Sequence, residues 1–259
     1  MKCLLTADLH YSLKQYDWVV RAAPDFDLVV LAGDHLDMFS AVDGRAQILV
    51  VSKYLERLSA LTQLMISSGN HDLDGEDGGE RSSRWILKLR AGIPTDGSAL
   101  LVGDTLFTIC PWWDGPLAKS RVAEQLARDA AKERARWIWI YHAPPEGALI
   151  AREFSGSLGD AELTQWVGHY QPDLVFCGHA HNAPFWQHGS WIDKIGATWV
   201  MNAGRQIGEI PAHIVIDTDE HAALWFSLAG AQIADLSRDR TTAVSTLTGP
   251  PAWFTAHHS

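Results

Sequence analysis

The stretch Cys3-Leu4-Leu5-Thr6-Ala7-Asp8-Leu9-His10 joins a short apolar run to an aspartate and a histidine. A continuous apolar run of this length is typical of a strand that is buried on both faces. Four more runs of this kind follow, at residues 28–31, 64–67, 137–140 and 174–177. Each run is followed within a few residues by Asp, Asn or His. The sequence therefore predicts buried strands with polar residues at their carboxyl ends.

Helical segments separate these predicted strands. Apolar residues recur at a spacing of three to four over residues 46–61, and a second helical stretch covers residues 117–136. In this second stretch, charged pairs such as Asp129 and Glu133 lie on the outer face. Strands that alternate with helices indicate a largely parallel sheet covered by helices, which is the α/β class.

The second half of the chain has a different pattern. Beyond residue 181, apolar runs follow one another with only turns between them, at residues 199–201, 213–216 and 224–228. This pattern predicts a β-rich, partly antiparallel second half. Residues 72–83 contain several glycines and no apolar period, so we expect a loop there.

The length of 259 residues fits one α/β domain. We expect this single domain to cover residues 1–236. Residues 237–259 are rich in Ser, Thr and Pro, with an isolated Trp253-Phe254 pair. We interpret this segment as a C-terminal tail that is either mobile or docked on a neighbouring subunit of a homo-oligomer.

Charge and cysteine content narrow the function classes. The chain has 31 acidic and 21 basic residues and a formal net charge of −10, which repels polyanions. A nucleic-acid duplex and a membrane surface are therefore not expected partners, and no apolar run approaches the roughly 18 to 20 residues that span a bilayer. The three cysteines, Cys3, Cys110 and Cys177, lack CxxC spacing. We therefore expect a reducing, cytoplasmic location.

The polar residues at the strand ends form the candidate site. Ligands of open α/β sheets bind outside the carboxyl ends of the strands, so these side chains are expected to converge on one crevice. They are Asp8, His10, Asp34, Asn70, His71, His142, His179 and His181. A mixture of carboxylate, imidazole and amide groups without thiolates suits Mn²⁺, Fe or Zn²⁺. Even seven of these side chains are too many ligands for one ion, whereas two ions that share a bridging carboxylate would use seven.

The order of these residues resembles the signature of the calcineurin-like metallophosphoesterases. That signature runs DxH, GDxxD, GNH(D/E), a lone H and GHxH. Its counterparts here are Asp8-Leu9-His10, Gly33-Asp34-His35-Leu36-Asp37, Gly69-Asn70-His71-Asp72, His142 and Gly178-His179-Ala180-His181. One such block occurs by chance in many proteins, but five blocks in order at strand ends are a specific signal.

The resemblance implies a fold and a ligand set. The implied fold is a four-layered αββα sandwich with two central mixed β-sheets and a metal site at the carboxyl ends of the strands. The implied ligands of one metal ion are Asp8, His10, Asp34 and His181. Those of the second ion are Asp34, Asn70, His142 and His179, so that Asp34 bridges the two ions.

The resemblance also implies a mechanism. A hydroxide between the two metal ions would attack phosphorus in line with the ester bond. His71 would face the scissile phosphate and protonate the leaving oxygen, and Asp37 would orient His71. The alternative role for Asp37 is to cap a turn. Asp72 is expected to brace the loop that carries Asn70.

We therefore expect a phosphodiesterase that acts on a small, soluble phosphate ester. A phosphomonoesterase or a protein phosphatase is the alternative, and a non-catalytic scaffold of the same fold is disfavoured because every motif block is present. Two residues are candidates for substrate binding. Trp113 could stack on a nucleobase or aryl group, or pack at the rim, and Arg205 could bind phosphate oxygens or pair with an acidic surface. The segment over residues 72–98 has no readable code for a substrate.

Overall fold

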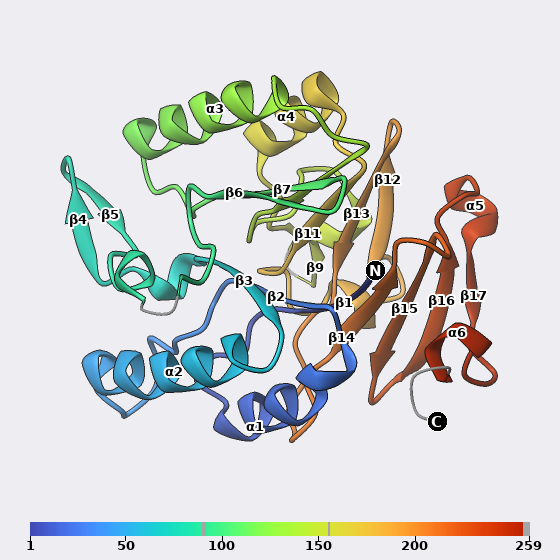
Figure 1. The fold of residues 1–259 in the computed structure, drawn as a ribbon, viewed down its shortest axis with the longest axis horizontal. Helices are drawn as coiled ribbons and strands as arrows, with labels where there is room; N and C mark the ends of the chain where they lie inside the picture. The colour runs from blue at the N-terminus through green and yellow to red at the C-terminus, as the bar shows by residue number, and fades with distance from the viewer. Residues whose placement is uncertain (90–91, 155, 256–259) are drawn as a thin grey trace.

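The computed structural model describes residues 1–89, 92–154 and 156–255. Two large mixed β-sheets lie against each other, and helices cover both outer sides (Figure 1). The architecture is the expected αββα sandwich, so the predicted fold class is confirmed.

The first sheet has seven strands. β1, β2 and β3 are neighbours and run parallel, in the α/β pattern that the sequence predicts. β14 pairs antiparallel with β1, and the last three strands extend the sheet antiparallel from β14. The spatial order is β17 (Val244–Thr246), β16 (Gly230–Asp235), β15 (Ala222–Ser227), β14 (His213–Asp217), β1 (Lys2–Thr6), β2 (Leu28–Ala32) and β3 (Gln63–Ser67).

The second sheet has six strands. Its four central strands run parallel, and the two edge strands pair antiparallel with their neighbours. The spatial order is β12 (Ile192–Ile195), β13 (Thr198–Asn202), β11 (Leu174–Cys177), β8 (Arg136–Ile140), β7 (Thr105–Ile109) and β6 (Ala99–Val102). The β-rich second half that the sequence predicts is therefore divided between the two sheets.

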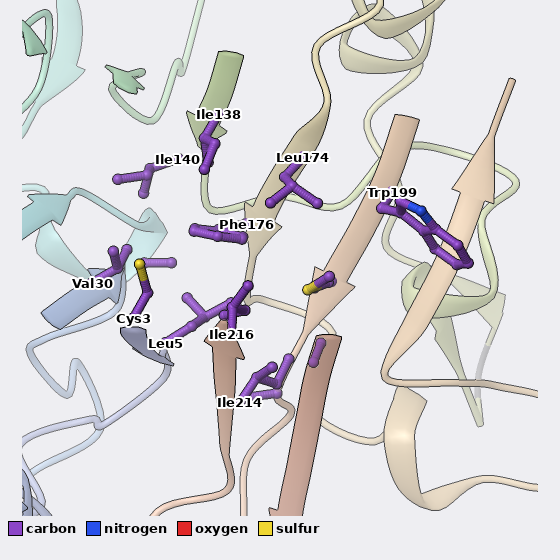
Figure 2. Packing of buried hydrophobic residues seen from close by; sticks show 14 of the residues in the cluster. Cys3, Leu5, Val30, Ile138, Ile140, Leu174, Phe176, Trp199, Ile214 and Ile216 are labelled. Carbon is purple, nitrogen blue, oxygen red and sulfur yellow. The ribbon is translucent and has the colours of Figure 1, made fainter. Parts of the chain in front are cut away.

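Alternating side chains explain why the two sheets and the helix layers pack together. In β1, Cys3 and Leu5 face the second sheet, whereas Leu4 faces the helices. In β8, Ile138 and Ile140 face the first sheet, and Trp137 and Trp139, which alternate with them, face the other helix layer. Figure 2 shows the side chains of the central layer meeting from both sheets. A strand with apolar residues on both faces is thus buried between a sheet and a helix layer.

Two helices cover each sheet. α1 (Leu13–Ala22) and α2 (Gly44–Ser59) pack on the first sheet, and α3 (Pro116–Ala130) and α4 (Ala161–Tyr170) pack on the second (Figure 1). The prediction of a helix over residues 117–136 places its end too late. The Arg134 guanidinium donates to the carbonyl oxygens of Ala130 and Lys132, which terminates the helix, and β8 begins at Arg136.

The prediction of a loop over residues 72–83 is wrong in part. β4 (Gly75–Asp77) and β5 (Glu80–Ser82) form an antiparallel hairpin. Gly78 and Gly79 make its turn, and both have positive φ angles, which is the conformation that a two-residue hairpin turn requires. The Glu80 carboxylate accepts hydrogen bonds from the first backbone N–H groups of α3, at Leu117 and Ala118. The hairpin is therefore attached to the start of α3.

Part of the expected tail pairs with the first sheet. α5 (Arg240–Ala243) leads into β17, which pairs with β16, and α6 (Ala252–Thr255) follows. Trp253 and Phe254 pack against the cluster beneath α1 and α2. The domain limit at residue 236 and docking on a neighbouring subunit stay predictions, and residues 256–259 of the tail lie outside the described residues.

Short elements complete the chain. They are η1 (Ala23–Asp25), η2 (Asn70–Asp72), η3 (Ile86–Lys88), η4 (Leu149–Ala151), η5 (Ala183–Phe185), β9 (Arg152–Glu153) and β10 (Gly156–Ser157). Among the described residues, every helix is too short or too polar to cross a membrane.

Candidate metal centre

The acidic and histidine side chains of the motif blocks meet at the carboxyl ends of the parallel strands. Two groups have ligand atoms that all lie within 4.8 Å of one another. The first group consists of Asp8, His10, Asp34 and His181, and the second of Asp34, His142 and His179. Asp34 belongs to both groups, so its carboxylate is placed to bridge two ions. Asn70 lines the same cleft.

Short distances show how closely the side chains converge. Nε2 of His181 lies 3.2 Å from Oδ1 of Asp8, and Nε2 of His142 lies 3.2 Å from Oδ2 of Asp34. Nε2 of His10 lies 3.1 Å from Nε2 of His181. The ring nitrogens and carboxylate oxygens of these residues therefore lie together in one small volume, and not in isolated pairs.

Two buried ligand atoms have no hydrogen-bond partner among the described residues. They are Oδ1 of Asn70 and Nε2 of His142. The opposite nitrogen of the His142 ring, Nδ1, lies 2.7 Å from the Ala32 carbonyl oxygen. The Ala32 carbonyl oxygen accepts the proton on Nδ1, so Nε2 is the ring nitrogen that faces the cleft and can bind a metal ion in exchange for its own proton. Buried polar atoms without partners are rare in proteins, and these two are placed to bind a cation.

The backbone at the strand ends is bent into an unusual conformation. Four candidate ligands have positive φ angles, namely Asp8 (56°), His10 (42°), Asp34 (54°) and His179 (68°). A residue other than glycine held in this region costs about 1–3 kcal/mol and persists only where the surrounding structure enforces it. Such strain at four positions of one cluster indicates a functional constraint.

Asp72 braces the loop that carries Asn70, as the sequence predicts. Its side chain is fully buried. Oδ1 accepts hydrogen bonds from the backbone N–H groups of His35 and Leu36, and Oδ2 accepts one from Gly69. The carboxylate therefore ties the loop after β2 to the loop after β3, and it positions Asp34 and Asn70 relative to each other.

Neighbouring charges shift the pKa values of the cluster residues in the direction opposite to the effect of burial. Burial favours the neutral form of Asp8, but hydrogen bonds from His10 and His181 hold its pKa well below its usual range. Burial also disfavours a charged His142, but the Asp34 and Asp8 carboxylates raise its pKa to about 9. The carboxylates therefore remain ionised at neutral pH, and the cleft presents negative charge to a cation.

A glycine packs directly against the bridging carboxylate. A Cβ atom added at Gly69 would lie 2.2 Å from Oδ1 of Asp34 and 2.6 Å from its backbone nitrogen. We expect Gly69→Ala to displace Asp34, to lower the metal content and to cost about 1–3 kcal/mol of stability. Metal analysis and thermal unfolding measure both effects. A Gly69→Ala protein with normal metal content and stability would contradict this prediction.

Gly168→Ala is the matched control for this substitution. Gly168 lies in α4 with nothing within 4 Å of the added Cβ atom. Alanine is favoured over glycine in a helix by about 1 kcal/mol. We therefore expect the control to keep its metal content and to be equally stable or more stable.

Sequence and structure comparisons identify the family. Residues 1–183 match the profile of the calcineurin-like phosphoesterases. The chain belongs to the calcineurin-like phosphoesterase family. Together with the cluster of Asp and His side chains, this membership indicates a binuclear divalent metal site. No curated protein matches the sequence at a significant level.

Solved structures share the fold of this phosphoesterase at low sequence identity. A purple acid phosphatase from yellow lupin (Lupinus luteus) seeds matches with a TM-score of 0.58 and 14% identity, over 95% of this chain and 53% of that chain. A dimetal phosphatase from Danio rerio matches with a TM-score of 0.55 and 13% identity, over 87% of this chain and 95% of that chain. At these identities the comparisons establish the fold alone.

His71 lies beside the metal cluster of this phosphoesterase. Its backbone N–H donates to Oδ1 of Asp34, and its ring lies 4.4 Å from the His10 ring, measured between centroids. The Met38 N–H donates to Nδ1 of His71 at 3.4 Å. Burial lowers the pKa of His71, so the ring is neutral at neutral pH. With Nδ1 as acceptor, the proton of the neutral ring is on Nε2.

Asp37 lies near His71, but its carboxylate caps the turn that follows β2. Oδ1 of Asp37 accepts a hydrogen bond from the Phe39 N–H at 2.9 Å, which is the turn-capping role that the sequence leaves open. A ligand atom of Asp37 also lies within 4.8 Å of ligand atoms of His10 and His71. An orienting effect of Asp37 on His71 stays a prediction.

The neighbouring tryptophans have different surroundings. The Trp113 indole N–H donates to Oδ2 of Asp160, which fixes the ring next to the start of α4. The Trp112 ring is the one beside the metal cluster, with its centroid 5.2 Å from that of His179. Trp112 also borders a cavity of about 650 Å³ between the β4–β5 hairpin and α3. The sequence analysis singled out Trp113, and substrate stacking on Trp113 stays a prediction.

Arg205 follows β13 and lies close to His181. Its backbone N–H donates to the His181 carbonyl oxygen at 3.0 Å, and its side chain is exposed. Burial and the charge of the guanidinium act to lower the pKa of His181, but the Asp8 carboxylate raises this pKa above its usual value overall. Arg205 therefore borders the metal centre, and its role in phosphate binding stays a prediction.

Proposed function

We propose that this protein is a phosphodiesterase that hydrolyses a small, soluble phosphate ester with two divalent metal ions. The observation that carries the proposal is the arrangement of six candidate ligands in two groups that share Asp34, with Asn70 lining the same cleft. Oδ1 of Asn70 and Nε2 of His142 have no hydrogen-bond partner among the described residues. Metal ions would satisfy both atoms and offset the negative charge of the two buried carboxylates.

The residues present fit two ions. We propose that Asp8, His10, Asp34 and His181 hold one ion and that Asp34, Asn70, His142 and His179 hold the other. The absence of thiolates and the mixture of nitrogen and oxygen donors favour Mn²⁺, Fe or Zn²⁺. When bound, such ions supply Lewis-acid stabilisation of phosphoryl oxygens and lower the pKa of water.

The side chains of the cleft have separate tasks in this proposal. His71 holds its proton on Nε2, from which it donates to the leaving oxygen of the ester. Asn70 is fixed at the start of η2, because Asp72 holds that loop. The Trp112 ring packs against the His179 ring and supports its position.

The charge of the cleft favours a diester over a monoester. Among the described residues, the lining contains no Lys or Arg, and it includes the carboxylate of Glu153. A monoester dianion carries one more negative charge than a diester and would require an additional cationic group. Arg205 is the neighbouring candidate for such a group, so phosphomonoesterase or protein phosphatase activity is the alternative.

The cellular setting is also part of the proposal. All three cysteines are free thiols buried in the structure, which supports a reducing, cytoplasmic compartment. The net charge of −10 supports a small-molecule substrate over a nucleic-acid duplex.

Hydrolysis rates on two chromogenic esters test this function. We expect Mn²⁺-dependent hydrolysis of bis(p-nitrophenyl) phosphate to exceed that of p-nitrophenyl phosphate at equal enzyme concentration and near-neutral pH. A monoester preference would replace the diesterase proposal with the phosphatase alternative. Absence of metal-dependent activity on both esters would contradict the proposed function.

A further inference from the structure

The loop between β2 and α2 exposes apolar side chains beside the metal centre. Met38 is 51% exposed, Phe39 is 85% exposed and Val42 is 41% exposed. Single exposed apolar residues are common on protein surfaces, but three within five residues make a local patch. Packing of the core does not require these side chains, because none of the three belongs to a core cluster of the described chain.

Hydrogen bonds fix the backbone of this loop. The Gln47 side chain, buried at the start of α2, accepts from the Asp37 N–H and donates to the carbonyl oxygens of Asp37 and Val42. The Phe39 N–H donates to the Asp37 carboxylate, and the Asp43 side chain caps α2. The exposed side chains are therefore held in place by an ordered backbone.

The loop contacts the side of the cleft on which His71 lies. The Phe39 ring approaches the His71 ring edge-on, with 5.8 Å between centroids. The backbone of the adjacent residue, Met38, donates to the same imidazole. Leu158, which is 41% exposed, lines the metal cleft together with His71. Phe39 and Met38 therefore lie next to His71, and Leu158 adds an apolar side chain to the lining of the cleft.

Other parts of the cleft lining are polar. Both carboxylate oxygens of Glu153 accept hydrogen bonds from Asn182, and both residues line the cleft. Arg205 contacts the adjacent residue, His181, through its backbone. The apolar contact to His71 therefore comes from the loop between β2 and α2.

We infer that Phe39, with Met38 beside it, forms a subsite for an apolar, preferably aromatic, leaving group. The inference rests on the proposed function, since it places the leaving oxygen next to His71. Water adds its oxygen to phosphorus, and the bond from phosphorus to the leaving oxygen breaks. The leaving oxygen takes the electron pair of that bond and a proton, which gives an alcohol or phenol and a phosphomonoester.

Two diesters that share a methyl arm test this subsite. Methyl p-nitrophenyl phosphate has an aromatic leaving group, and methyl 2,2,2-trifluoroethyl phosphate has a small one. We expect Phe39→Ala to lower kcat/KM for the aromatic ester about fivefold to tenfold, mainly through KM, because an aromatic contact is lost. The value for the trifluoroethyl ester should change less than twofold, and Phe39→Leu should give an intermediate loss.

Two controls separate this effect from damage to the site. Leu101→Ala removes another exposed apolar side chain (53%), on the edge strand β6, and should leave the rates on both esters unchanged. The metal content of Phe39→Ala should equal that of the wild type. Equal losses for both esters, or no loss for the aromatic one, would overturn the subsite while the proposed function stands. If the wild type hydrolyses neither ester in the presence of Mn²⁺, both the proposed function and the subsite are overturned.

Discussion

Asp34→Asn is expected to lower kcat/KM for diester hydrolysis by about three orders of magnitude. The reason is that a metal site contributes several kcal/mol of Lewis-acid stabilisation to the transition state, and about 1.4 kcal/mol corresponds to a factor of ten in rate. Asp34 is the one carboxylate that belongs to both groups of candidate ligands. Asparagine keeps the shape of the side chain and one oxygen, but it removes the negative charge and the ability to bridge through two oxygens. Metal content should therefore fall together with activity.

Metal analysis and initial rates on bis(p-nitrophenyl) phosphate measure this effect. Asn at position 34 still has an oxygen that can accept the His71 N–H, which Oδ1 of Asp34 accepts in the structure. The loop conformation is therefore expected to survive. Asp25→Asn, at an exposed aspartate in η1, is the matched control and should have no effect. An Asp34→Asn protein with wild-type metal content and activity would contradict a bridging role.

His71→Gln is expected to lower kcat by about 10²- to 10⁴-fold while the metal content stays unchanged. The reason is that His71 offers a proton to the leaving oxygen but is not required as a ligand in the proposed site. The loss should be larger for a poor leaving group, such as an alkoxide, than for p-nitrophenolate, which needs little protonation. Rates on a series of aryl and alkyl diesters measure this dependence.

His188→Gln is the matched control for His71→Gln, since His188 is exposed. We expect its rates to equal those of the wild type for every ester. A loss in His71→Gln that is the same for all leaving groups, or that is accompanied by loss of metal, would contradict the role of His71 as a proton donor.

The sequence predicted the parts of the fold that depend on regular patterns. Continuous apolar runs located β1, β2, β3, β8 and β11, because strands buried on both faces have no polar positions. The polar residues after these strands indicated where the site lies, since parallel strands end at one edge. Both inferences depend on local sequence and on a general rule of topology, and the structure agrees with both.

Features that depend on distant contacts were not predictable. Gly78 and Gly79 suggested a loop, and the hairpin that they turn is held by Glu80 at the start of α3, some forty residues away. The end of α3 depends on how the Arg134 side chain folds back onto its carbonyl groups. Neither arrangement leaves a periodic pattern in the sequence.

The directions in which loop side chains point could also not be predicted from the sequence. Trp112 and Trp113 are the same residue type, but they have different surroundings. The backbone N–H of Trp112 donates to Oγ of Ser68, and the Trp112 ring lies beside the metal cluster. The Trp113 indole N–H donates to Asp160 instead. The positive φ angles of the candidate ligands likewise arise from tertiary constraint, because Asp and His do not favour this conformation strongly enough to signal it.

The number of divalent ions bound per chain tests the central claim most directly. Metal-free protein would be dialysed against Mn²⁺ or Zn²⁺, and bound metal would be measured by inductively coupled plasma mass spectrometry. We predict two ions per chain in the wild type, with diester hydrolysis rising as both sites fill. A protein that binds no ion, or that reaches full activity with none bound, would contradict a binuclear metal centre at Asp34.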